Sequence, residues 1–190
     1  RYPTGERAPD ALWGSVKIYL DLSRQEKGRS YYTKRSDARM QALAEKYPAS
    51  PYAAQAQLIE GQKYQDTQDW LKAAELYQKL KPGSAGYEEG LLGAGTCYLQ
   101  HATNLLREKK SDEAKVYLSN AETWLKKALT ELDKKSSATL DRDLLARLGS
   151  QAFGAKTTLA SLYLLNDVNR ESEIFPLFEG GELFVFPVVR

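Results

Sequence analysis

The chain repeats its own opening. One stretch, YPTGERAPDALW, begins at Tyr2, and a second, YPASPYAAQAQL, begins 45 residues later at Tyr47, with small alanines at matching places. In both stretches a proline follows the tyrosine, and it disfavours a helical backbone conformation for that tyrosine. Any helix that comes before must therefore end there. A second proline, Pro9 or Pro51, then stands where the first turn of a new helix tolerates it. Recurrence at this interval predicts stacked supersecondary units that share a continuous core.

The second copy leads into a predicted helical hairpin, with helices at about 51–66 and about 69–81. Across this hairpin, the spacing G-x2-Y-x8-A-x3-Y is formed by Gly61, Tyr64, Ala73 and Tyr77. Glycine costs roughly 1 kcal/mol inside a helix, so its place there needs a packing reason. The spacing resembles the core signature of the tetratricopeptide repeat family.

That resemblance implies an all-α fold, a right-handed superhelical stack of antiparallel helix pairs of the α-solenoid type. In this family the small residues mark close helix crossings, aromatic rings fill the gap within each hairpin, and the first helix of each pair lines the concave face. The repeat openings are also similar to those of bacterial envelope members, of the outer-membrane assembly lipoprotein and Tol-Pal coordinator type. This likeness implies a periplasmic or envelope-associated setting.

We expect about seven helices in a repeat domain over residues 1–166. The predicted pairs lie at about 9–46, 51–81 and 87–134. In the third pair Gly95 repeats the role of Gly61, and Leu125 aligns with Tyr77. A further helix at about 140–165 is either the first arm of a fourth pair or a cap on the last open face.

Two segments depart from this pattern. In the first pair we expect the second arm at about 36–46, with 29–35 as an inserted loop or an early helical turn. Segment 29–35 is basic and aromatic, and it is either solvated or a partner contact. The apolar tail, 167–190, is expected to be non-helical, with extended segments at 174–178 and 183–186 on either side of Gly180 and Gly181. It packs on the stack, enters a partner, or belongs to a longer protein of which this chain is a segment.

Composition and single residues argue against several classes of function. The 27 basic and 25 acidic side chains of the protein are interspersed along the chain, whereas a nucleic-acid binder usually concentrates its basic residues on one face. Cys97 is the only cysteine and His101 the only histidine, so neither an internal disulfide nor a Cys-rich metal site is possible. We expect Cys97 to be a small buried apolar residue and His101 a surface or partly satisfied histidine, rather than a nucleophile and its base. No metal, cofactor, catalytic residue or membrane span is predicted.

The sequence therefore predicts a protein-interaction scaffold or assembly subunit, which binds a partner polypeptide on its concave face. The alternative is a helical accessory domain of a larger protein, with any catalysis elsewhere, and a membrane-associated assembly is one setting for either. Phased on Gly61 and Gly95, the outward positions of the first helices are Asp10, Trp13, Lys17, Gln55, Leu58, Gln62, Gln65, Glu89, Leu92, Thr96 and Leu99. Trp13 is the strongest single candidate, because tryptophan is enriched at binding hot spots.

Overall fold

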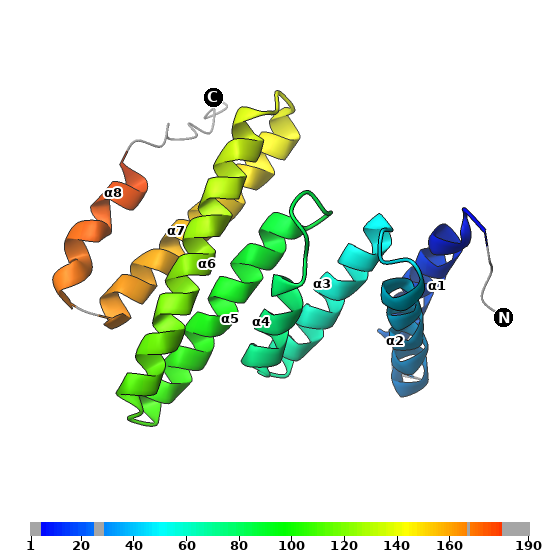
Figure 1. Cartoon of the computed structure of the whole chain (residues 1–190), viewed down its shortest axis with the longest axis horizontal. Coiled ribbons are helices and arrows are strands. Elements are labelled where there is room, and N and C mark those ends of the chain that lie inside the picture. Colours follow the sequence, from blue (N-terminus) through cyan, green and yellow to red (C-terminus); the bar gives the residue numbers. More distant parts are fainter. Residues whose placement is uncertain (1–4, 25–28, 167, 180–190) are drawn as a thin grey trace.

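The described residues form a row of helices. A computed structural model describes residues 5–24, 29–166 and 168–179, and over these ranges it contains eight α-helices, one 3-10 helix and no strand. In chain order the elements are α1 (Ala8–Ser23), α2 (Arg29–Lys46), α3 (Pro51–Asp66), α4 (Trp70–Gln78), α5 (Tyr87–Arg107), α6 (Ser111–Ser137), α7 (Arg142–Asn166), η1 (Val168–Glu173) and α8 (Phe175–Phe178). The predicted all-α class is confirmed. Figure 1 shows the helices side by side along the long axis of the molecule.

Local signals explain where the second and third hairpins begin and turn. Ser50 caps α3 by accepting a hydrogen bond from the backbone N–H of Tyr52, with Pro51 in the first turn. Both hairpins then turn through a left-handed residue, Gln68 with φ 61° and Lys109 with φ 62°. The backbone N–H that follows each of these residues donates a hydrogen bond to the carbonyl five residues earlier. Asp69 donates to Tyr64 at 2.8 Å, and Lys110 donates to Leu105 at 2.9 Å. This is the Schellman end of a helix, and it recurs between α3 and α4 and between α5 and α6.

The first helices of the pairs form one continuous layer. Each helix packs against the next in the chain, and α1 also contacts α3, α3 contacts α5, and α5 contacts α7. The backbones of the second helices stay further apart: within the described ranges, α2 does not approach α4 closely, nor does α4 approach α6. The layer of first helices is therefore the closer-packed side of the stack.

A single ring sets the spacing of α3, α4 and α5. Tyr77 projects from α4 between two glycines, and a Cβ added to either Gly61 or Gly93 would lie 2.6 Å from a ring carbon. The same contact recurs one pair later, where a Cβ on Gly95 of α5 would lie 2.6 Å from Leu125 of α6. The equivalence of Leu125 and Tyr77 inferred from the sequence thus appears in the packing. Glycine is required at these positions because the neighbouring side chain occupies the space that a methyl group would take.

Replacing either glycine beside Tyr77 should destabilise the protein. The ring is blocked on both edges and cannot slide away, so Gly61→Ala and Gly93→Ala should each lower the free energy of unfolding by about 1–3 kcal/mol. Gly14→Ala in α1 is the matched control, because nothing lies within 4 Å of the added Cβ. It should raise stability by up to about 1 kcal/mol through helix propensity. Urea unfolding measures all three, and stabilisation by Gly61→Ala would contradict the packing described here.

The bounds of the elements decide two expectations and overturn a third. Helix α2 begins at Arg29, so of the two alternatives for segment 29–35 the early helical turn is confirmed and the inserted loop is not. The third pair is longer than the second, as its predicted range implies, with 21 residues in α5 against 16 in α3 and 27 in α6 against 9 in α4. The prediction of an extended segment at 174–178 is wrong, because Phe175–Phe178 is helical, with Pro176 in its first turn where proline is tolerated. The second predicted extended segment, 183–186, lies outside the described residues.

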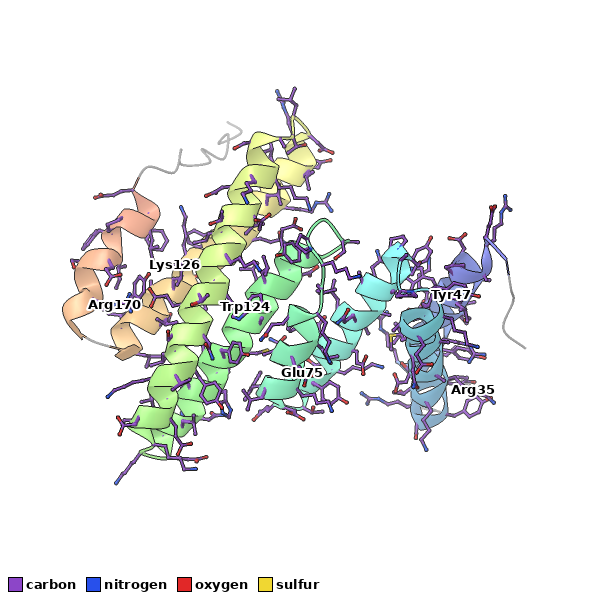
Figure 2. All side chains as sticks on the ribbon, viewed as in Figure 1. Arg35, Tyr47, Glu75, Trp124, Lys126 and Arg170 are labelled. Atoms are coloured by element: carbon purple, nitrogen blue, oxygen red, sulfur yellow. The ribbon has the colours of Figure 1, made fainter. Side chains whose placement is uncertain are left out.

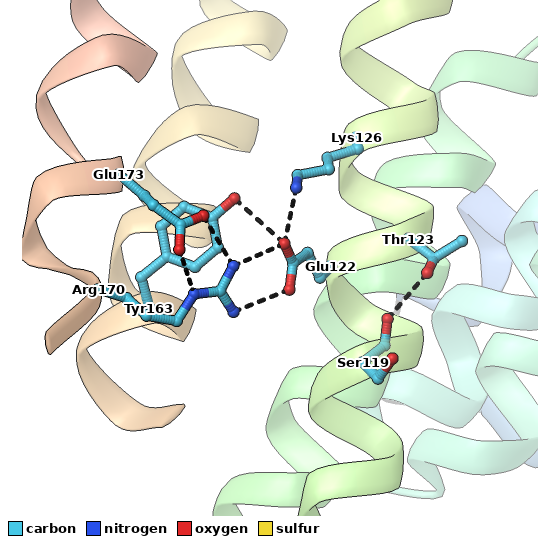
Figure 3. A network of polar contacts seen from close by, with 7 residues as sticks. All are labelled: Ser119, Glu122, Thr123, Lys126, Tyr163, Arg170 and Glu173. Carbon is cyan, nitrogen blue, oxygen red and sulfur yellow. Dashed lines mark hydrogen bonds and ion pairs between the residues drawn. The ribbon is translucent and has the colours of Figure 1, made fainter. Parts of the chain in front are cut away.

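An ion cluster attaches the C-terminal elements to the stack. η1 and α8 pack against α7, and Ile174 and Leu177 lie against the core formed by α5, α6 and α7. The guanidinium of Arg170 donates to both oxygens of Glu122 on α6, at 3.0 Å and 2.8 Å, and to Glu173 at 2.6 Å and 2.9 Å (Figure 3). It also lies 4.2 Å from the ring centroid of Tyr163 on α7. η1 and α8 thus lie against α7 at the C-terminal end of the described residues.

This cluster should make stability depend on acid pH. Hydrogen bonds from Arg170 and then Lys126 lower the pKa of Glu122 to about 2. An unfolded glutamate has a pKa of about 4.3, so the ionised form stabilises the fold above that pH, and this contribution is lost as the pH falls toward 2.

Glu122→Gln should therefore cost about 1–3 kcal/mol near neutral pH. The difference from the unmodified protein should shrink between about pH 4.5 and pH 2. Urea unfolding across this range, with Glu60→Gln as an exposed control on α3, measures the effect. A constant difference at every pH would show that Glu122 contributes through packing alone.

Candidate functional site

A groove of about 490 Å³ crosses the layer of first helices. It is lined by Trp13 of α1, by Gln55, Leu58, Ile59, Gln62 and Gln65 of α3, by Tyr77 of α4, and by Glu89 and Gly93 of α5. A smaller hollow of about 200 Å³ lies between α2, α3 and α4, with Met40 and Leu76 among its lining residues. We refer to the larger hollow as the groove.

Helix α3 supplies most of the groove because its lining residues recur at three- and four-residue intervals. That spacing places Gln55, Leu58, Gln62 and Gln65 on one face of the helix. Tyr77 donates a hydrogen bond from its hydroxyl to the side-chain oxygen of Gln65, at 2.9 Å. Burial raises the pKa of Tyr77, so the hydroxyl stays protonated and remains a donor. Gln55 and Gln62 make no side-chain hydrogen bond to any other described residue, so their amides remain available to a ligand.

The ring of Trp13 is held at the edge of the groove by a neighbour on α3. It stacks on Tyr52, with ring centroids 5.6 Å apart and planes 14° from parallel. The Tyr52 hydroxyl donates to a carboxylate oxygen of Asp10 at 2.7 Å, and this bond raises the pKa of Tyr52. The hydrogen bond to Asp10 fixes the ring of Tyr52, and the stacked ring of Tyr52 in turn positions Trp13 between α1 and α3.

The predicted site residues fall into three groups. The groove brings together Trp13, Gln55, Leu58, Gln62, Gln65 and Glu89. Asp10 and Lys17 are exposed on α1 outside it, and Leu92 and Thr96 are half-buried further along α5. The prediction that Leu99 points outward is wrong. It is 5% exposed and packs with Leu159 and Leu162 of α7, because α7 covers the C-terminal half of α5.

Three lining residues were not among the predicted ones. Ile59 follows Leu58, and the groove is wide enough to include both. Tyr77 was assigned to the interior of its hairpin, yet one part of the ring also reaches the groove. Gly93 gives no local signal of its own, because its role depends on which neighbour α4 places against it. The run GLLGAG in α5 would predict the contact of Gly93 only if every glycine in the run marked a point where a neighbouring helix packs closely.

The possible nucleophile is enclosed. The Cys97 side chain is 0% exposed, and burial raises the pKa of its thiol to about 12. His101 lies one helical turn away, half-buried, with its ring edge-on to Tyr117 at a centroid distance of 4.5 Å. No group of three or more His, Cys, Asp or Glu side chains in the described ranges is arranged to hold a metal ion.

None of the helices in the described part of the chain combines the length and the apolar character that crossing a bilayer requires. Comparison with protein-family models, with curated proteins and with solved structures gives no match to this chain.

Cys97 should react with a thiol reagent only after unfolding. With a pKa of about 12, roughly one thiol in ten thousand is ionised at pH 8, and the reagent cannot reach it in the folded state. The native protein should show almost no labelling over minutes, and the protein in strong denaturant should take up one equivalent. Rapid labelling of the native protein would mean that the α5–α6 core opens readily.

Proposed function

We propose that the chain is a protein-interaction scaffold whose groove binds an extended segment of another polypeptide. The observation that carries the proposal is the convergence of α1, α3 and α5 on one hollow that combines free amides with apolar side chains. A peptide presents the matching chemistry, since its backbone carries donors and acceptors and its side chains supply apolar groups.

An extended segment fits this lining better than a helix does. A helix satisfies its own backbone hydrogen bonds, whereas an extended chain leaves N–H and C=O groups for the partner to satisfy. Glutamine offers both a donor and an acceptor. Gln55 and Gln62 are seven residues apart on α3, a rise of about 10 Å, which matches about three residues of extended peptide.

The remaining lining adds selectivity for the side chains of the segment. Trp13, Leu58 and Ile59 present an apolar wall that suits one large aliphatic or aromatic side chain. Among the described residues that line the groove, Glu89 is the only charged one, and it favours a Lys or Arg of the partner. The proposed ligand is therefore an extended segment with an apolar anchor and a basic residue nearby.

The architecture we propose for the whole stack is a curved tetratricopeptide-like array with the groove on its concave face. Two observations support it. In the described residues the backbones of successive first helices approach one another more closely than those of the second helices, which is expected if the first helices line the inner side of a curve. The turn through Gln68 and the contact of Gly61 with Tyr77 both recur in the next hairpin.

Selection of peptides from a random displayed library against the whole chain tests the proposal. Binding of the selected peptides should weaken by at least about tenfold in the Trp13→Ala, Gln62→Ala variant. The matched control, Val116→Ala with Gln100→Ala, removes an exposed apolar group and an exposed amide from α6 and α5. It should leave binding unchanged.

Gln62→Ala alone is the milder variant, since Gln62 is exposed and its loss should not disturb folding. A photo-activated cross-linker placed at position 62 should attach to the bound peptide, and one at position 116 should not. Equal loss of binding in the groove variant and the control, or cross-linking from both positions alike, would show that the groove is not the binding surface.

A further inference from the structure

A second surface, separate from the groove, is formed by tyrosine rings and arginines on α1 and α2. It consists of Tyr19, Tyr31, Tyr32, Arg35 and Arg39, which we call the tyrosine–arginine cluster. Arg35 projects from the side of α2 that faces away from the rest of the stack (Figure 2). Asp37, which pairs with Lys63 of α3, lies on the opposite side of α2. The cluster therefore belongs to the outer end of the row.

The rings of the cluster hold both guanidinium groups in place. Tyr19 of α1 stacks on Tyr32 of α2 at a centroid distance of 6.2 Å, and Tyr31 meets Tyr32 edge-on at 5.4 Å. The guanidinium carbon of Arg39 lies 4.8 Å from the ring centroid of Tyr19, and that of Arg35 lies 5.1 Å from Tyr31. Because a ring supports each guanidinium, less side-chain entropy is lost when it binds an anion.

The cluster carries positive charge that the described part of the chain does not neutralise. Arg29, Lys34, Arg35 and Arg39 all lie on α2, and none of them is within ion-pairing distance of a carboxylate of the described residues. Two described acids near the cluster in the sequence have other partners, since Asp21 pairs with Arg24 and Asp37 with Lys63. Exposed cations normally remain solvated, but here two of them are oriented and lie one helical turn apart.

We propose that the tyrosine–arginine cluster is a docking surface for an acidic polypeptide segment. Arg35 and Arg39 are about 6 Å apart along α2, and alternate side chains of an extended peptide are about 7 Å apart. Carboxylates at alternate positions can thus each meet one guanidinium, whose fork of N–H groups matches a carboxylate. The partner is a segment in which Asp or Glu recurs at every second residue.

A nucleic acid fits the surface less well. Stacking of bases requires free ring faces, and here Tyr32 and Arg39 lie against the ring of Tyr19, while Arg35 occupies one face of Tyr31, which is 54% exposed. Asp37 and Glu45 also interrupt the basic residues of α2, and the net charge of the chain is only +2. This surface is independent of the groove, which prefers a basic side chain, so the two proposals fail or succeed separately.

Fluorescence anisotropy with a labelled twelve-residue peptide of alternating glutamate and serine tests the inference on the whole chain. The peptide should bind, and more weakly as salt is raised. Arg35→Gln with Arg39→Gln should weaken binding about tenfold, and Arg35→Gln alone by less. The control, Arg107→Gln with Arg142→Gln, changes the net charge equally at exposed sites on α5 and α7 and should leave binding unchanged.

Three results would overturn the inference: no binding of the acidic peptide, equal weakening in the cluster variant and the control, or tighter binding of a labelled twelve-nucleotide oligothymidylate through the same arginines. Circular dichroism of each variant confirms that its helices are intact. Trp13→Ala with Gln62→Ala should not alter binding of the acidic peptide, which distinguishes this surface from the groove.

Discussion

The arrangement of α3, α4 and α5 depends on the space that two glycines leave for the ring of Tyr77. Gly61 and Gly93 belong to different helices, and the ring between them comes from a third, so one side chain determines how closely all three approach. The same residue also contributes to the groove, because its hydroxyl orients Gln65. Packing and the candidate site are therefore not separable at this point. A change that widens the helix crossing also moves the Gln65 amide that lines the groove.

Sequence reasoning succeeded where a structural partner lies within one hairpin. Gly61 and Tyr77 are joined by a single turn, so their spacing along the chain is enough to predict that they meet. It failed where the partner comes from another unit. The contact of Tyr77 with Gly93 and the burial of Leu99 by α7 depend on how one hairpin is placed on the next, and no local periodicity records that placement. For this reason four of the five groove residues of α3 were predicted, whereas Gly93 of α5 was not.

At the C-terminal end of the described residues, α7 is covered by the short elements η1 and α8 and not by a long helix. The composition of the tail predicted extended structure, because it is rich in Phe and Val around Gly180 and Gly181. The structure instead uses a charged residue, Arg170, to fix η1 to α6 and α7, with Ile174 and Leu177 as apolar contacts. An ion cluster covers less apolar surface than a full second arm would, and Phe153 of α7 and Phe175 of α8 remain 61% and 73% exposed.

The junction between the first two pairs is bordered by the groove on one side and by the smaller hollow on the other. In a row where each pair contacts only its neighbours, such a junction can separate without unfolding the rest. Trp13 lies on one side of it and Gln62 on the other, so a ligand in the groove would bind both halves at once. The binding free energy of the ligand would then add to the free energy needed to separate the two pairs. Occupancy and the rigidity of the N-terminal pair would then be thermodynamically linked, and each would be measurable through the other.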